Sequence, residues 1–271
     1  MGISRSTYYY KPKNDSKKDA DLADKINDIA LEYPYYGYRR ITAVLKRDGI
    51  KVNHKKVYRI MKDKNILCRA RKSFRTTNSA HSLTRYPNLI KNIVAERINQ
   101  IWHADITYIR ISASLVYLAA IIDGCSRKVV GYGLGKTLSA DLPLAALRDA
   151  IEKRKPGSNL IHHSDQGIQY CSYDYIEVLN EYGITISMSS KANPYDNAKI
   201  ESFFRSLKVE EVYMFSYETY EEIRGRIPYF IEEVYNRKRL HSSLGYMPPE
   251  EFEDIIINKE KENESRQLVL T

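Results

Sequence analysis

The sequence predicts an α/β fold, a five-stranded mixed sheet with flanking helices, preceded by a small all-α domain. Up to about residue 68, apolar residues recur every three to four positions, which is the helical period. From Gln100 onward the predicted segments follow the order βββ-α-β-α-β-α, which is typical of helices packed on a mixed sheet. With 271 residues, the chain is long enough for one large core and one small domain.

The charge is divided unevenly along the chain. Residues 1–100 carry 23 Lys and Arg against 9 Asp and Glu, whereas the rest carries 20 against 25. A basic front half is typical of a protein that meets a polyanion, although a solvated basic surface gives the same composition. Neither a bilayer-length apolar run nor a secretory signal is present, which predicts a cytoplasmic protein. The three cysteines have no CxxC spacing, so no disulfide framework or zinc ribbon is predicted.

The front of the chain is predicted to be an extended arm, residues 1–17, followed by a helical domain, residues 18–68. The expected helices are Lys18 to Leu31, Tyr38 to Arg47 and a third that follows the N-cap Asn53. Two short helices joined by a tight turn, the second rich in cations, are typical of a helix-turn-helix that enters the major groove. A three-helix bundle with solvated lysines would give a similar pattern. The candidate DNA contacts are Arg39, Arg40, Lys55, Lys56 and Arg59.

Residues 69–99 read as a basic linker, because residues 69–88 contain almost no large aliphatic side chains. Its arginines could follow a phosphate backbone, although a solvated connector would have much the same composition.

Residues 100–250 are predicted to form the core of the large α/β domain. Three tightly joined strands, WHADITYIRI, LVYLAAIID and RKVVGYGLG, should form an antiparallel meander. The segments expected after them are helix Ser139 to Lys153, strand NLIHHSD, helix Tyr173 to Tyr182, strand ITISM, helix Pro194 to Val209 and helix Thr219 to Arg239. The charged tail, residues 251–271, reads as disordered.

Three acidic residues of this core have distinct predicted positions. Asp105 lies in the first strand, Asp165 at the carboxyl end of the fourth, and Glu201 on the helix after the fifth. Ligands of α/β sheets gather at such carboxyl ends, and three carboxylates with substrate phosphate could hold two Mg²⁺ ions, with Mn²⁺ as a substitute. The spacing alone is weak evidence, because any one of them could be a cap or a surface ion pair. Asp123, at the end of the second strand, is predicted to cap the turn that follows it, and assistance to the metal site is the alternative.

Local context strengthens this interpretation. The motifs, in chain order, are SRSTYYY, YGYRRI, IWHADITYI, IDGCSRKVVGY, HHSDQGIQYCS, NPYDNAKIESFFRSLKVE and YNRKRLHSSLGYMPPEEF. With them the chain resembles the insertion-sequence transposases whose second reading frame encodes an Asp-Asp-Glu core of the retroviral-integrase, ribonuclease H-like kind. The resemblance implies metal-dependent cleavage at element ends and transfer of the freed 3′-hydroxyl to target DNA. It assigns Asp105, Asp165 and Glu201 as the catalytic, metal-binding triad.

Further site residues follow from the same motifs. Arg205 and Lys208 lie one and two turns beyond Glu201 on the same helix face, and the family has a basic residue at the second place. We expect both to face the DNA backbone; a surface pair of Glu201 with Arg205 is the alternative. The resemblance makes Asn197 and Gln169 candidates for positioning the DNA strand.

Two histidines close to the aspartates are left without an assigned role. His163 could face the site or be a structural histidine. His103 departs from the small or apolar residue that the family has before its Ala-Asp pair.

The resemblance also implies partners: double-stranded DNA as element ends and target, a homo-oligomer on DNA in the nucleoid, and the upstream-frame product or a frameshift fusion with it. Two alternatives are a retroelement integrase and a catalytically silent DNA-binding regulator. The first usually carries an HHCC zinc module, which the sequence lacks.

Overall fold

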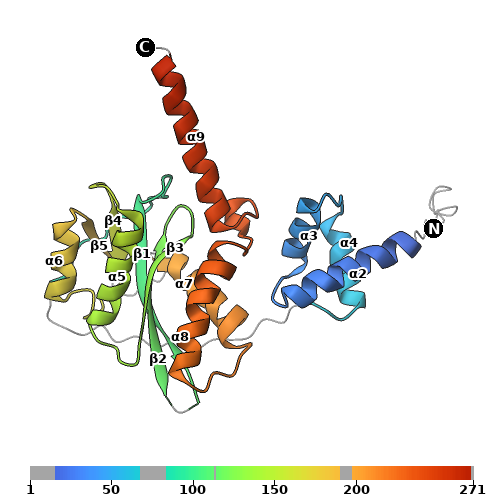
Figure 1. The fold of residues 1–271 in the computed structure, drawn as a ribbon, viewed down its shortest axis with the longest axis horizontal. Helices are drawn as coiled ribbons and strands as arrows, with labels where there is room; N and C mark the ends of the chain where they lie inside the picture. The colour runs from blue at the N-terminus through green and yellow to red at the C-terminus, as the bar shows by residue number, and fades with distance from the viewer. Residues whose placement is uncertain (1–15, 68–83, 113, 190–196, 270–271) are drawn as a thin grey trace, which may run out of the picture. The chain divides into compact units, whose positions relative to one another are not determined.

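The computed structural model describes residues 16–67, 84–112, 114–189 and 197–269, and it divides the chain into two compact units, Met1–Ala70 and Arg71–Thr271 (Figure 1). Residues 1–15 of the expected N-terminal arm and residues 69–83 of the expected linker lie outside the described residues, and residues 16 and 17 of the expected arm belong to the first helix.

The described part of the small unit contains the expected helices. They are α2 (Ser16–Glu32), α3 (Tyr38–Arg47) and α4 (His54–Asp63). One apolar face of each helix is buried against the other two, through Ile26, Ile41, Leu45, Val57 and Met61. The expected N-cap is confirmed, because the Asn53 side chain accepts a hydrogen bond from the Lys55 amide at 2.9 Å.

The larger unit is built on a five-stranded mixed sheet in the order β3-β2-β1-β4-β5. The strands are β1 (Ile101–Arg110), β2 (Leu115–Asp123), β3 (Val129–Gly135), β4 (Ile161–Ser164) and β5 (Thr185–Met188). β1, β2 and β3 form the expected antiparallel meander, and β4 is parallel to both β1 and β5. The predicted α/β class is therefore confirmed.

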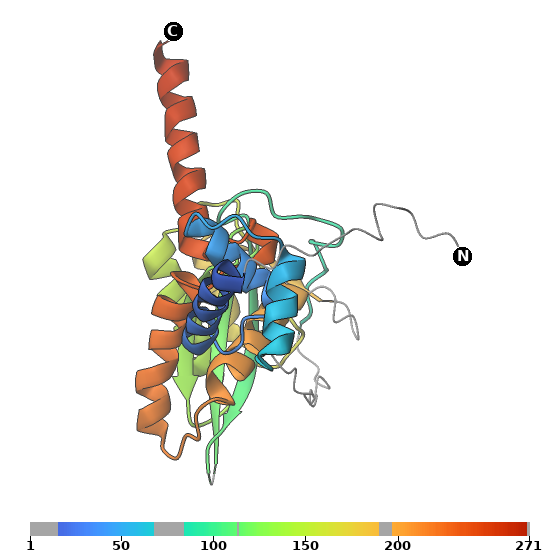
Figure 2. The same cartoon turned by 90° about the vertical axis from the view of Figure 1, so that its right-hand side faces the viewer.

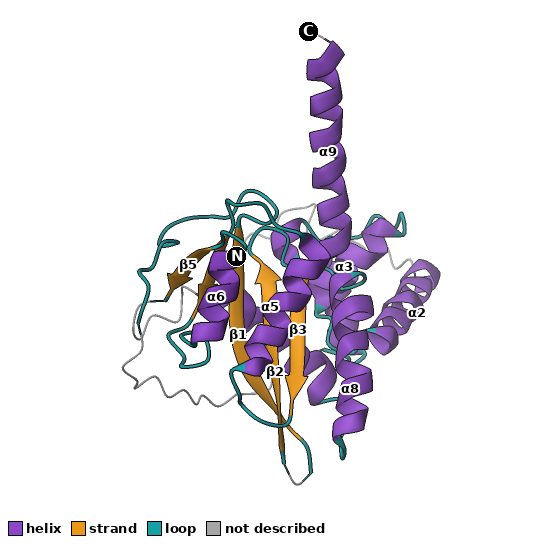
Figure 3. Cartoon of the chain, turned by 60° about the vertical axis from the view of Figure 1, so that its left-hand side comes forward, coloured by secondary structure: helices purple, strands orange, loops and turns teal. Residues whose placement is uncertain are grey.

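Helices cover both faces of this sheet (Figure 3). On one face, α5 (Asp141–Arg154) and α6 (Tyr173–Glu181) pack on Trp102 and Ala104 of β1. On the other face, α7 (Ala198–Leu207) and α8 (Tyr220–Tyr229) pack on Ile109 of β1 and on β2. Because side chains alternate along a strand, the odd-numbered residues of β1, including Asp105, face α7.

The last two helices of the core each continue into a wider, π-helical turn. η2 (Lys208–Val212) follows α7, and η3 (Phe230–Asn236) follows α8 shortly after Pro228, which cannot donate a backbone hydrogen bond. The sequence predicts helix in both places but not this change in winding.

The C-terminal tail is helical, so the expectation of disorder after residue 250 is wrong. A short 3₁₀ turn, η4 (Ser242–Leu244), precedes the long helix α9 (Pro249–Val269), which extends away from the sheet (Figure 2). Its first turns are anchored by Glu253, which is 3% exposed and accepts two hydrogen bonds from Arg154 at 2.7 Å and one from the Ser126 hydroxyl at 2.6 Å. The Glu and Lys residues that suggested a disordered tail are also good helix formers.

The second half of the expected linker packs on the larger unit. Ile90 and Ala95 are buried beside Ile101. The Leu89 amide donates to the Ser187 hydroxyl at 2.9 Å, which ties this stretch to β5. Residues 87–95 therefore belong to the larger unit rather than to a linker.

Candidate active site and nucleic-acid interface

The register between β1 and β4 brings Asp105 and Asp165 together. In this parallel pair Ile101 lies opposite Ile161, and His103 lies opposite His163. Each aspartate follows its matched histidine by two residues, so the pleat directs both carboxylates to the same face of the sheet. That face is the one covered by α7, which carries Glu201.

The pKa of Asp105 shows that other carboxylates lie near it. Burial, followed by charge repulsion from Asp165 and to a smaller extent from Glu201, raises the pKa of Asp105 to about 8. The Ile106 amide, which donates to Asp105 at 2.8 Å, and the Lys208 ammonium oppose this rise in pKa. The structure therefore brings three carboxylates from β1, the end of β4 and α7 within electrostatic reach of one another.

Asp165 and Glu201 are held by their own local structure. Asp165 accepts a hydrogen bond from the Gly167 amide at 2.8 Å, which closes a turn directly after β4. Glu201 lies in the first turn of α7 and is exposed, because the helix packs on the sheet through Ile200, Phe203 and neighbouring apolar residues.

The donor set suits a hard divalent cation. Carboxylate oxygens are the ligands that Mg²⁺ takes in proteins. The raised pKa of Asp105 reflects burial first and then the negative charges of Asp165 and Glu201, which a cation would neutralise. Among the described residues, no three His, Cys, Asp or Glu side chains stand close enough to enclose a metal as they are arranged. The three acidic side chains would have to approach one another on metal binding.

Lys208 lies beside this carboxylate group. Its ammonium nitrogen sits 4.7 Å from the centre of the Tyr108 ring. Burial lowers the pKa of Lys208, and the nearby Asp105 charge opposes that effect. Arg205, one turn earlier, is exposed to solvent on α7.

Asn197 and Gln169 border the carboxylates in different ways. Asn197 is buried at the start of α7, and its amide group donates to the Ala104 carbonyl at 3.1 Å. This bond fixes the beginning of α7 on β1, next to Asp105. Gln169 is half-buried, and its side chain lies near that of Asp165, with both close to Gly167.

Two buried histidines, His103 and His163, each precede one of the aspartates by two residues and face the same side of the sheet. The rings of His103 and His163 meet edge to face with centroids 5.7 Å apart. His163 exchanges a hydrogen bond with the Ser187 hydroxyl at 2.9 Å, so it ties β4 to β5. Burial lowers the pKa of His103 well below its ordinary value, and the charge of Lys199 lowers it further.

Asp123 caps a turn, as the sequence predicts. One of its oxygens accepts hydrogen bonds from the amides of Cys125 and Ser126, both at 2.9 Å, and the other accepts from the Asn99 amide at 2.7 Å. These donors hold the carboxylate inside the turn between β2 and β3.

The cations of the small unit fall into two groups. Lys56 and Arg59 form ion pairs with Asp19 of α2. Arg39 donates to the Tyr38 hydroxyl at 3.1 Å, and Arg40 lies over the Tyr36 ring at 5.3 Å.

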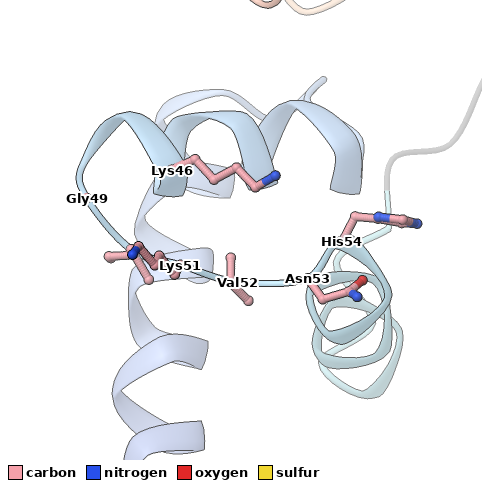
Figure 4. Close-up of a pocket in the computed structure, with 7 residues that line it drawn as sticks. Lys46, Gly49, Lys51, Val52, Asn53 and His54 are labelled. Atoms are coloured by element: carbon pink, nitrogen blue, oxygen red, sulfur yellow. The ribbon is translucent and has the colours of Figure 1, made fainter.

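The turn between α3 and α4 adds residues that the sequence analysis did not name as DNA contacts. Lys46, Lys51, Asn53 and His54 line a hollow of about 590 Å³ around this turn (Figure 4). The signal that could have found them is the placement of Lys51 and His54 directly before and at the start of the cationic helix α4. A helix N-terminus favours anions, so this turn is a second place where phosphate could meet the domain.

Comparison with known protein families defines the class of this fold. Residues 95–194 and 182–249 match two family models that are both described as Integrase core domain, and residues 17–74 match an HTH-like domain. The chain also resembles a simian T-cell lymphotropic virus intasome, solved in complex with PP2A regulatory subunit B56 gamma. The TM-score is 0.51 at 15% identity, over 84% of this chain and 74% of that chain. The fold is thus an integrase core preceded by an HTH-like domain.

Sequence relatives identify the family more closely. The chain is 37% identical over 261 residues to the insertion element IS600 uncharacterized 31 kDa protein of Shigella sonnei, covering 94% of this chain and 96% of the relative. It is 37% identical to the transposase for insertion sequence element IS904 of Lactococcus lactis, covering 90% and 97%. It is 38% identical to transposase InsF for insertion sequence IS3A of Escherichia coli, covering 81% and 77%. The chain belongs to the insertion-sequence transposases with an integrase core domain.

No helix within the described residues combines the length and the apolar character that crossing a lipid bilayer requires.

Proposed function

We propose that the protein is a DDE-type transposase, which cuts DNA at the ends of an insertion element and joins the freed 3′-hydroxyl to target DNA. The observation that carries the proposal is the position of Asp105 on β1, within electrostatic reach of both Asp165 after β4 and Glu201 on α7. Membership of the insertion-sequence transposases supports the same chemistry.

Asp105, Asp165 and Glu201 would hold Mg²⁺, with Mn²⁺ as a substitute. Ions held there would activate a water or a 3′-hydroxyl for in-line displacement at phosphorus and would stabilise the negative charge on the departing oxygen. Carboxylates on a rigid sheet and its packed helix keep their positions through both steps, cleavage and strand transfer.

The chain's other residues would position the DNA. Lys208, beside Asp105, would pair with a backbone phosphate and balance the negative charge of the carboxylates. The hydrogen bond from the Asn197 side chain to the Ala104 carbonyl would fix the start of α7 on β1 and so fix the position of Glu201 relative to that strand. Gln169, near Asp165, and the exposed Arg205 would contact the strand on either side.

The small unit would supply most of the DNA affinity. The hollow around Lys51 and His54 and the cations on α3 and α4 would contact phosphates or base edges of double-stranded DNA. Element ends have to be brought together for transposition, so we propose that the protein assembles as a homo-oligomer on DNA. The upstream-frame product, or a fusion with it, would join this assembly.

The test is a cleavage and strand-transfer assay with the full chain, Mg²⁺ and labelled duplexes that carry the element ends. Asp105→Asn, Asp165→Asn and Glu201→Gln should each abolish both products, while Asp174→Asn, an exposed carboxylate on α6, should leave them unchanged. Full activity in any of the three variants would overturn the assignment.

A further inference from the structure

A second hollow lies next to the proposed metal site. It has a volume of about 730 Å³ and is formed by the start of α7, the turn between β2 and β3, the segment before β1 and the segment after η3. Its polar and charged lining residues include Lys91, His103, Arg127, Lys199, Ser202 and His241. No Asp or Glu is among the described residues that line it.

The lining is cationic without matching acids. Lys91 is exposed, whereas Arg127 and Lys199 are half-buried, and among the described residues none of the three forms an ion pair with a carboxylate. Lys199 and Arg127 lie within electrostatic reach of each other, and the carboxylate within reach of both is that of the buried Asp123, which is already hydrogen-bonded by the amides of its own turn. Like charges held together in this way favour an anion between them.

A buried polar side chain also opens into the hollow. His103 is 2% exposed, and neither ring nitrogen makes a hydrogen bond of normal geometry among the described residues, although the Asn197 side chain lies close enough to hydrogen-bond one of them. A single amide partner satisfies at most one ring nitrogen, so the other remains for a ligand or a water. Because a neutral imidazole carries one N–H donor, His103 could donate to a phosphate oxygen.

The hollow adjoins the proposed site through two elements. Lys199 and Ser202 are three residues apart on α7, so they share one side of the helix. Glu201 points away from Lys199 and lies roughly a quarter turn from Ser202 around the helix. His103 precedes Asp105 by two residues on β1 and faces the same side of the sheet. An anion in the hollow would therefore sit beside the carboxylates and not among them.

We propose that this hollow binds a backbone phosphate of the DNA strand, adjacent to the phosphate that reacts at the carboxylates. Lys199 and Arg127 supply the charge, and Ser202 and His103 supply neutral donors. A volume of 730 Å³ exceeds that of a phosphate alone and leaves room for the adjoining sugar beside Ile90 and Tyr235. The inference rests on the proposed function, because a DNA strand at Glu201 is what brings a phosphate to the hollow.

The test measures how DNA binding depends on salt. The full chain is titrated with a fluorescent duplex of 30 base pairs and arbitrary sequence in EDTA, so that no cleavage occurs, over a series of NaCl concentrations. A plot of log K against log salt has a negative slope, and loss of one phosphate contact reduces the steepness of that slope by about 0.9. A lower slope is therefore a less steep one. The variants are Lys199→Ala, Arg127→Asn, which tolerates the positive φ of 64° at that position, and the double variant.

We expect each single variant to lower the slope and to weaken binding several-fold. The double variant should lower the slope by about one in total, because both cations share one phosphate. Lys136→Ala is the matched control, an exposed lysine after β3 whose contact in the described structure is the Tyr220 ring. It should leave the slope unchanged.

A second arm separates DNA from a free anion. Sodium orthophosphate is added to the wild-type protein and to Lys199→Ala at constant ionic strength, and thermal unfolding is recorded. Orthophosphate that stabilises only the wild-type protein, together with an unchanged salt slope in Lys199→Ala, would mean that the hollow takes a free anion and would overturn the DNA assignment. Pocket variants that match the wild-type protein in both arms would overturn the site itself.

The binding experiment is independent of catalysis. A wild-type protein that cleaves no DNA would overturn the proposed function, yet the loss of salt slope in the pocket variants would still report a phosphate contact. A normal salt slope in those variants would remove only the inference about the hollow.

Discussion

At the scale of single residues, Asp105 is the most informative side chain. The native fold holds its carboxylate half-buried on β1 and close to two others, which raises its pKa to about 8. Such an arrangement lowers stability unless a cation compensates it, so it is the kind of local strain expected at a functional site.

Replacing Asp105 by Asn should stabilise the metal-free protein. The folded pKa lies above the ordinary value of 3.8, so the charge of Asp105 destabilises the fold progressively as the pH rises between these values. In EDTA at pH 8 we expect the variant to gain about 1 kcal/mol, or about 2–4 °C in Tm, measured by calorimetry. Asp174→Asn should change nothing, and a Tm for Asp105→Asn below that of the wild-type protein would contradict this account.

The same pKa predicts how metal binding depends on pH. Below about pH 8 a proton occupies Asp105 and competes with the cation. The rise in Tm caused by 10 mM Mg²⁺, to give an order-of-magnitude concentration, should therefore grow from pH 6 to pH 8 and then level off. A Tm shift that is constant over this range would mean that Asp105 takes no part in holding the metal.

At the scale of elements, the long C-terminal helix depends on one buried ion pair. Glu253 of α9 and Arg154 of α5 are joined by two hydrogen bonds of 2.7 Å, and both side chains are largely buried. Removal of one partner of such a pair leaves the other charge buried and uncompensated.

Glu253→Gln should release α9 from the core. We expect a loss of about 3 kcal/mol in the free energy of unfolding by urea and faster hydrogen exchange along α9. Glu250→Gln is the matched control, because Glu250 pairs with Arg237 and Lys128 at a more exposed surface and should contribute under about 1 kcal/mol. Equal losses in the two variants would argue against the buried anchor.

Local pattern in the sequence predicts the elements, and the parts it misses depend on distant contacts. The alternation of WHADITYIRI and the apolar run of β2 are enough to predict strands, and Asn53 is enough to predict a helix start. The helical state of α9 depends on Arg154, about a hundred positions away in the chain, so composition alone indicated disorder. The segment that contains Ile90 is predicted to be a linker for the same reason, because local composition does not reveal its packing on Ile101.

The candidate site shows the same division. The sequence predicts which strand or helix carries each carboxylate. The separation of the three residues along the chain does not show that they lie close together in the fold. That follows from the register between β1 and β4, which places His103 opposite His163 and so directs both aspartates to one face. The hollow beside Lys199 draws on segments from residue 90 to residue 243, and no local motif marks it.

At the scale of the whole molecule, the proposed function assigns most of the DNA affinity to the small unit and metal binding to the larger unit. The small unit holds cations around the α3–α4 turn, and the larger unit holds the carboxylates. Changes in the small unit should therefore leave metal binding by the larger unit intact.

Lys51→Ala should weaken binding to duplex DNA about three- to tenfold at low salt and leave the Mg²⁺-induced rise in Tm unchanged. Lys56→Ala is the comparison within the same unit, because Lys56 is engaged by Asp19 and should affect DNA binding less. Fluorescence anisotropy and calorimetry check the two properties. If Lys56→Ala weakens DNA binding more than Lys51→Ala does, the proposal that the α3–α4 turn contacts DNA is wrong.

The central claim is that Asp105, Asp165 and Glu201 ligate the catalytic metal directly, and exchanging a carboxylate for a thiolate tests it most directly. Thiolate ligands suit softer cations than Mg²⁺, so Asp105→Cys should be inactive in Mg²⁺ and regain element-end cleavage when Mn²⁺ is supplied. Cleavage in Mg²⁺ at the wild-type level, or no recovery in Mn²⁺ by a variant that folds and binds DNA normally, would contradict the claim.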